Sequence, residues 1–167
     1  MNDNFAHNPL ESAEKFLNDQ NWDFQRLNED QLYLTVEGDR GLYRILFIWD
    51  VDNHALQYCC ELDINLDEER KEFAHQLLGE INSKLWLGHF DLSSDPANTT
   101  CSPCFRYTSL MPGGIKEQGY TFMKELFSYT LTECERLHEA MMMLDDGTGH
   151  AHSDKMKLMM ADAVGSC

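Results

Sequence analysis

His89 and Asp91 are the first residues of this chain whose types and spacing suggest chemistry. Residues two apart on a strand point to the same face, so the aspartate can orient a histidine that acts as a general base. The competing interpretation is a structural hydrogen bond where a helix meets a sheet. Because no nucleophile or second acid can be identified, the structural interpretation is favoured and we predict no catalytic residue.

Cys101 and Cys104 form a C-x-x-C motif. Redox enzymes place the attacking cysteine at the start of a helix, where the dipole lowers its pKa, whereas this motif leads into a predicted strand. A structural zinc site needs four ligands, so Cys59, Cys60 or His89 would have to complete the set. We predict no metal or other cofactor. A small metal- or thiol-dependent enzyme using Cys101, Cys104 and His89 remains the alternative function.

Methionines gather towards the end of the chain. Three of them are consecutive, Met141 to Met143, and cannot all face inward from one helix. Methionine fills irregular gaps in cores and also lines adaptable binding surfaces. The terminal helix predicted at residues 153–167 is too short to be stable alone, so it must dock on its own domain, a second copy or a client.

The stretch from residue 31 to residue 64 contains three strand-like runs joined by tight turns. The first and third runs alternate apolar and polar residues. The second, from Leu42 to Trp49, is apolar on both faces apart from Arg44. Such runs predict an antiparallel meander, and a sheet of this kind must cover at least one face with other elements.

Helices are predicted on both sides of this meander. Asn8 and Pro9 are start signals for a first helix, and a second helix runs from Asp67 to about Trp86, with Phe73 in its inward stripe. Strands at 88–92 and 104–110 and a long helix at about 116–144 follow. The predicted fold is therefore α+β: an antiparallel sheet of about five strands flanked by helices, in the order α-β-β-β-α-β-β-α. We expect one domain over residues 1–144, a linker at 145–152 and a short methionine-rich helix and tail at 153–167.

Three helices do not easily cover both faces of a five-stranded sheet. One outcome is an exposed apolar patch of the kind that binds a partner. The other is that the long helix and the tail wrap back and bury the second face, and the sequence leaves both open. The candidate partner-binding residues are Leu42, Leu46, Ile48, Met142, Met143, Met156, Met159 and Met160.

The charge balance excludes some partners. The 167 residues include 29 acidic and 13 basic ones, for a formal net charge of −16. Such a surface repels phosphate backbones, so we expect no nucleic-acid partner and no docking on anionic lipid. No apolar run approaches the ~18 residues of a membrane span, and the start has no basic leader followed by an apolar stretch. We therefore expect a cytoplasmic protein whose six cysteines are free thiols.

The segment LWLGHFDL at residues 85–92 resembles a motif of the bacterial YbjN family of sensory transduction regulators. Residues 8–10, Trp22, residues 36–38 and Trp49 agree with the same pattern, and the resemblance covers roughly residues 8–144. It implies a fold like that of type III secretion chaperones, which are small, acidic, often homodimeric proteins that hold client segments without doing chemistry. The family motif is carried by Trp86, Gly88, His89, Phe90 and Asp91.

The resemblance and the uncovered sheet together lead to one functional prediction. We predict a non-enzymatic protein-binding module of chaperone-like fold, a regulator in a bacterial signalling pathway, that captures a partner segment on an apolar surface. The expected partner is a protein or peptide, and a homodimer is a further expectation from the resemblance.

Overall fold

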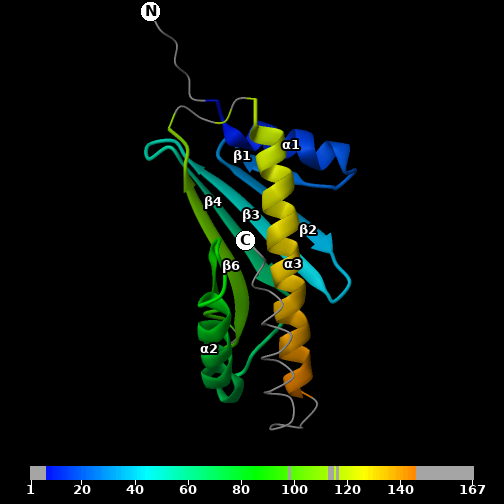
Figure 1. Ribbon diagram of the computed structural model, residues 1–167, viewed down its shortest axis with the longest axis vertical. Coiled ribbons are helices and arrows are strands. Elements are labelled where there is room, and N and C mark those ends of the chain that lie inside the picture. Colours follow the sequence, from blue (N-terminus) through cyan, green and yellow to red (C-terminus); the bar gives the residue numbers. More distant parts are fainter. Residues whose placement is uncertain (1–6, 98, 113–114, 116, 146–167) are drawn as a thin grey trace, which may run out of the picture.

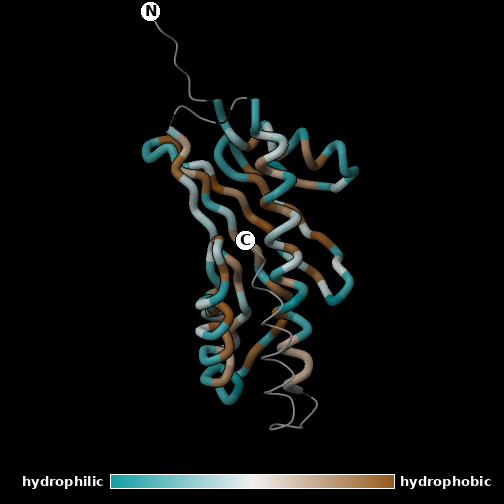
Figure 2. The backbone as a smooth tube through the Cα atoms, viewed as in Figure 1, coloured by the Kyte–Doolittle hydropathy of each residue, from teal (hydrophilic) through white to brown (hydrophobic). Residues whose placement is uncertain are grey.

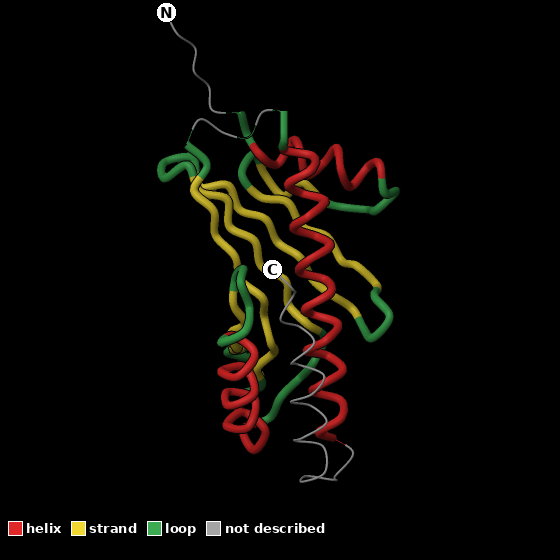
Figure 3. The backbone as a smooth tube through the Cα atoms, viewed as in Figure 1, coloured by secondary structure: helices red, strands yellow, loops and turns green. Residues whose placement is uncertain are grey.

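Six strands form one antiparallel sheet in the order β1-β2-β3-β4-β6-β5 (Figures 1 and 3). The computed structural model describes residues 7–97, 99–112, 115 and 117–145, so the predicted linker and terminal helix, with Met156, Met159 and Met160, lie outside the described residues. The elements are α1 (Pro9–Asp19), β1 (Gln25–Asn28), β2 (Gln31–Glu37), β3 (Leu42–Asp50), β4 (Ala55–Leu62), α2 (Glu68–Asn82), β5 (His89–Ser94), β6 (Cys101–Leu110) and α3 (Gly119–Asp145).

The predicted α+β class is confirmed, and the strand that the sequence missed is β1. This strand has only four residues, three of them exposed, so it lacks the apolar alternation that marks the others. It pairs with β2 across a register shift between Arg26 and Asn28. The second helix also ends earlier than predicted, at Asn82 instead of Trp86.

Local signals explain where α1 begins. The side chain of Asn8 accepts a hydrogen bond from the backbone N–H of Leu10, and Pro9 occupies the first helical position, where no N–H is needed. One face of the helix then buries Leu10, Ala13, Phe16 and Leu17.

Phe127 of α3 ties α1 and the sheet into one core. Its ring lies 5.2 Å from that of Phe16 in α1, 5.5 Å from Phe47 in β3 and 6.1 Å from Tyr58 in β4, measured between ring centroids. All four rings are buried, and such aromatic contacts add to the burial of apolar area. The long helix thus crosses the sheet on the face that carries Phe47 and Tyr58 (Figure 1).

The second helix packs on this same face. Its buried side chains Ala74, Leu77, Leu78 and Ile81 belong to the single core that contains Phe90 and Phe105. Those two phenylalanines are cross-strand partners, with ring centroids 5.3 Å apart. Asn82 at the end of α2 fixes the edge strand, because its side chain accepts from the backbone N–H of Phe90 and donates to the carbonyl of the same residue.

The other face of the sheet carries the alternate residues of each strand, and among the described residues no helix covers it. Tyr33, Leu46, Ile48 and Cys59 on this open face are half-buried by their strand neighbours, and Leu42 is 41% exposed. Much of the face is polar: Arg44 forms ion pairs with Glu61 and Asp63, each 2.8 Å between nitrogen and oxygen. Figure 2 shows how hydrophobic and hydrophilic residues alternate along the strands. The helices therefore cover one face.

We predict that Phe127→Ala lowers the free energy of unfolding by about 3–5 kcal/mol, because it leaves a cavity where α1, α3 and the sheet meet. Phe73→Ala is the matched control: Phe73 is 42% exposed, so the same substitution should cost about 1 kcal/mol or less. Urea unfolding followed by far-ultraviolet circular dichroism measures both, and equal losses would contradict the packing described.

Candidate functional site

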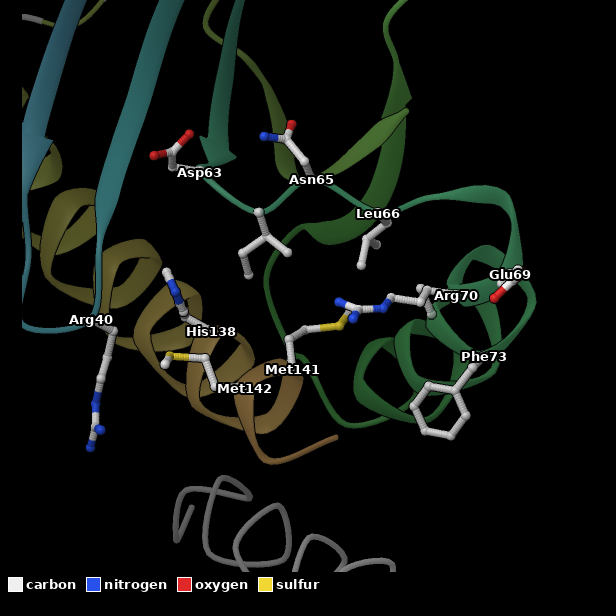
Figure 4. A pocket seen from close by; sticks show the side chains of 12 residues that line it. Arg40, Asp63, Asn65, Leu66, Glu69, Arg70, Phe73, His138, Met141 and Met142 are labelled. Carbon is white, nitrogen blue, oxygen red and sulfur yellow. The ribbon is translucent and has the colours of Figure 1, made fainter. Parts of the chain in front are cut away.

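A groove of about 590 Å³ lies between α2 and the C-terminal part of α3 (Figure 4). It takes residues from the β2–β3 turn, the segment after β4, α2 and α3. The lining residues are Arg40, Asp63, Ile64, Asn65, Leu66, Glu69, Arg70, Phe73, Ala74, His138, Met141 and Met142.

The groove exists because α3 is longer than the strands beneath it. Twenty-seven residues of helix span about 40 Å, whereas the nine residues of β3 span about 30 Å. His138 still packs against the sheet, since a Cβ added to Gly41 in the β2–β3 turn would meet its ring at 2.4 Å. The next turn of α3 passes the sheet edge and faces α2 across the gap (Figure 1).

The floor of the groove is apolar and its rim presents exposed side chains. Leu66, Ala74 and Met141 are buried in the floor. Phe73 is 42% exposed and Met142 is 53% exposed, and they stand on the α2 and α3 sides respectively. Phe73 was predicted to face inward, and that prediction is wrong. Helical periodicity identifies the apolar stripe, but the stripe is buried only from Ala74 onwards, and Phe73 stays exposed in the N-terminal half of α2.

The ionisable groups around the groove are largely committed to structural contacts. Arg40 pairs with Glu139 at 3.1 Å, and Asp63 pairs with Arg44 at 2.8 Å. His138 is 7% exposed, and its burial lowers the pKa of the imidazole, against a smaller opposing effect of Glu135. The ring is therefore neutral at pH 7, and it lies edge-on to Tyr43 with centroids 6.2 Å apart.

The structure places His89 and Asp91 on the same strand face, two residues apart in β5. His89 is exposed. The Asp91 carboxylate accepts hydrogen bonds from Arg106 Nε at 3.2 Å and from the backbone N–H of Leu92 at 2.7 Å. These contacts hold the Asp91 carboxylate next to Arg106.

The remaining motif residues shape the junction between α2 and β5. Gly88 has a φ of 66°, and an added Cβ would lie 2.4 Å from the ring of Phe105, so both backbone conformation and space favour glycine. Trp86 is 78% exposed and contacts Tyr129 of α3, with ring centroids 5.0 Å apart. Trp86 therefore covers the outer surface of α3 at Tyr129.

Cys101 and Cys104 do not form the pair that the sequence suggested. They lie three residues apart in a regular strand, opposite Ser94 and Asp91 respectively, so their side chains point to opposite faces of the sheet. Cys101 is on the core side near Leu66, and Cys104 is on the open face. A site that uses both cysteines together is thus excluded by the geometry of β6. In the part of the chain that the structure describes, no three His, Cys, Asp or Glu side chains are grouped to hold a metal ion.

The residues predicted to bind a partner fall on two separate surfaces. Leu42, Leu46 and Ile48 lie on the open face of β3. Met142 lines the groove on the helical side, and Met143 beside it is half-buried. Met142 and Phe73 line the same groove, and the sequence analysis did not include Phe73 among the partner-binding residues.

The fold is shared with a protein of known structure. A solved structure with the same arrangement is described as "Crystal structure of YbjN, a putative transcription regulator from E. coli". It is 11% identical, covers 75% of this chain and 87% of its own, and superposes with a TM-score of 0.53, which shows a shared fold.

The sequence pattern of the YbjN family, described as "Putative bacterial sensory transduction regulator", matches residues 9–140, and the chain belongs to this family. The comparison with curated proteins gives no match. None of the described helices has the length and apolar character needed to cross a membrane.

The buried imidazole of His138 makes stability depend on pH in a defined direction. Its pKa is lower in the folded protein than in the unfolded chain, where it is about 6.5, so its stabilising contribution is complete above that pH and is lost as the pH falls. We predict that His138→Gln reduces the loss of stability between pH 7.5 and pH 5.5 in urea unfolding. The exposed His75→Gln should leave the loss unchanged, and identical profiles for both variants would contradict the assignment.

Proposed function

We propose that this protein is a non-enzymatic regulator that binds an amphipathic segment of another protein in the groove between α2 and α3. The observation that carries the proposal is that Phe73 and Met142, both exposed, line the two sides of one groove above an apolar floor. An exposed apolar patch beside a groove is typical of a surface that binds a partner.

The groove has room for the apolar side chains of a partner helix. Two helices flank it, and its volume of about 590 Å³ accommodates several apolar side chains. A helix laid in such a groove presents anchors at spacings of three and four residues. Methionine adapts to anchors of different shape, so Met141 and Met142 suit a client whose side chains vary.

Charge favours a partner segment with basic residues beside its apolar face. The net charge of the protein is −16, although within the groove itself Arg40 and Arg70 offset Asp63 and Glu69. Complementary charge speeds encounter and selects orientation more than it adds affinity. We therefore propose an amphipathic segment flanked by Lys or Arg.

A binding role, as opposed to catalysis, is supported by the chemistry of the lining. Arg40 and Asp63 are held in ion pairs, and His138 is neutral and packed against Tyr43. We propose the cytoplasm as the location, because the five described cysteines are free thiols, as expected in a reducing compartment. The homodimer expected from the resemblance to secretion chaperones stays a prediction.

Site-specific photocrosslinking tests the proposal in the full chain. We predict that p-benzoylphenylalanine at position 142, expressed in bacterial cells and irradiated, gives a discrete adduct with another protein. Phe73→Glu should reduce that adduct by about tenfold or more, because it removes an interface anchor and adds a charge. Mass spectrometry of the adduct should map the crosslink to an amphipathic segment rich in Lys or Arg.

Leu110 provides the control position, because it is 73% exposed on the open face and lies outside the groove. The same photoreactive residue there should not give the position-142 adduct. Equal adducts at both positions, or an adduct whose yield is unchanged by Phe73→Glu, would contradict the proposal. An adduct with a second copy of this chain would replace it with a dimer interface.

A further inference from the structure

Three reactive or charged side chains meet on the open face of the sheet, on the side opposite the groove. Cys59 of β4 is the cross-strand partner of Arg106 in β6, and Glu61 of β4 is the partner of Cys104. Cys59 and Cys104 are therefore diagonal neighbours on adjacent strands and share one face. The sequence separates them by more than forty residues, and only the β4–β6 pairing brings them together.

Arg106 is held in a fixed position against this pair. Its Nη1 lies 3.6 Å from the Cys59 sulfur, and its Nε donates to Asp91 Oδ2 at 3.2 Å. The carboxylate of β5 thus anchors one edge of the guanidinium while another nitrogen faces the thiol. A cation so placed stabilises a thiolate, which is the nucleophilic form of cysteine.

The two thiols differ in character. The neighbouring Cys104 thiol, which can donate its S–H, is the largest cause that lowers the pKa of Cys59, and Arg106 adds to it; together they outweigh burial and bring the pKa to about 6. The pKa of Cys104 is raised, by its contact with Cys59 and by burial. Cys59 is also partly accessible, whereas Cys104 is 4% exposed.

The other charged and titratable groups on this face are paired with one another or lie beside Arg106. Arg44 of β3 is paired with Glu61 of β4 and with Asp63, and His89 of β5 is the cross-strand partner of Arg106. Leu46 is the partner of Cys59 on the β3 side, so that flank is apolar. Among the described side chains, Arg106 is therefore the cation that contacts the Cys59 sulfur.

We propose that Cys59 and Cys104 form a dithiol site that hydrogen peroxide oxidises to a disulfide, with Cys59 as the attacking sulfur. The Cys59 thiolate attacks one peroxide oxygen, the O–O bond breaks, and Cys59 becomes a sulfenic acid while the other oxygen leaves as hydroxide and takes a proton to form water. The Cys104 thiol then attacks the Cys59 sulfur, the S–O bond breaks, and the hydroxyl leaves as a second water. Two thiols and one peroxide thus give one disulfide and two waters.

A second pair of thiols in the core provides an internal control. Cys60 and Cys134 have their sulfurs 3.6 Å apart, but both are fully buried. Burial raises the pKa of Cys134, and Cys60 contributes further to that shift. Proximity alone therefore does not make a reactive site, and the proposal assigns reactivity to exposure and to Arg106.

The test uses the full chain with Cys167→Ser, which removes the terminal thiol, treated at pH 7 with equimolar hydrogen peroxide. Free thiols are then blocked under denaturing conditions, and peptides are analysed by mass spectrometry. We expect a Cys59–Cys104 disulfide, one peroxide consumed per disulfide, and free Cys60, Cys101 and Cys134. Arg106→Gln should slow the oxidation severalfold through a smaller thiolate fraction, whereas Arg44→Gln, which also loses ion pairs on this face, should leave the rate unchanged.

Cys104→Ser separates the two steps. In this variant Cys59 should stop at the sulfenic acid, which dimedone traps, and circular dichroism reports whether the fold is kept. Oxidation of Cys59 no faster than that of Cys101 would overturn the proposal. So would equal rates for the Arg106 and Arg44 variants, or a Cys59 sulfenic acid that persists in the protein that retains Cys104.

Discussion

The packing of α3 across a single face of the sheet is the constraint on which the rest of the structure depends. Phe127 contacts α1, β3 and β4 at once, so one helix fixes both the position of the first helix and the face that becomes the core. The second helix joins the same layer through the pair Phe90 and Phe105. All three helices lie on this side, so in the described part of the chain no helix covers the other face. Both candidate surfaces result from this one-sided packing.

The two candidate surfaces are consequences of different features of the layered fold. The groove forms because α3 is longer than the strands. Beyond His138 the helix no longer has sheet beneath it, and Met141 points towards α2 while Met142 points away from it (Figure 4). The thiol site forms because β4 pairs with β6, which places Arg106 next to Cys59 on the side without helices. The two proposals therefore concern opposite sides of the protein: a partner segment in the groove and a small oxidant at the thiol site.

Much of the fold could be predicted because strand alternation and capping signals are local. The alternation in β2 and β4 and the Asn8–Pro9 start of α1 all appear in the structure. β1 was missed because its residues are mostly exposed, and Phe73 was misplaced because periodicity does not show where a neighbouring surface ends. Cys101 and Cys104 looked like a pair because a sequence motif ignores backbone conformation, and in a strand a spacing of three points to opposite faces. The partnership of Cys59 with Cys104 depends on a non-local register that no local pattern encodes.

Covalent footprinting of the full chain tests the one-sided coverage of the sheet most directly. Tyr33 in β2 and Tyr58 in β4 allow the same residue type to be compared on the two faces. Tyr33 is half-buried on the open face, whereas Tyr58 is fully buried on the helical face. Under hydroxyl radicals the account predicts that Tyr33 is modified at a rate typical of partly exposed tyrosine while Tyr58 is protected. Equal protection of both tyrosines in the monomeric protein would show that both faces are covered and would contradict the account.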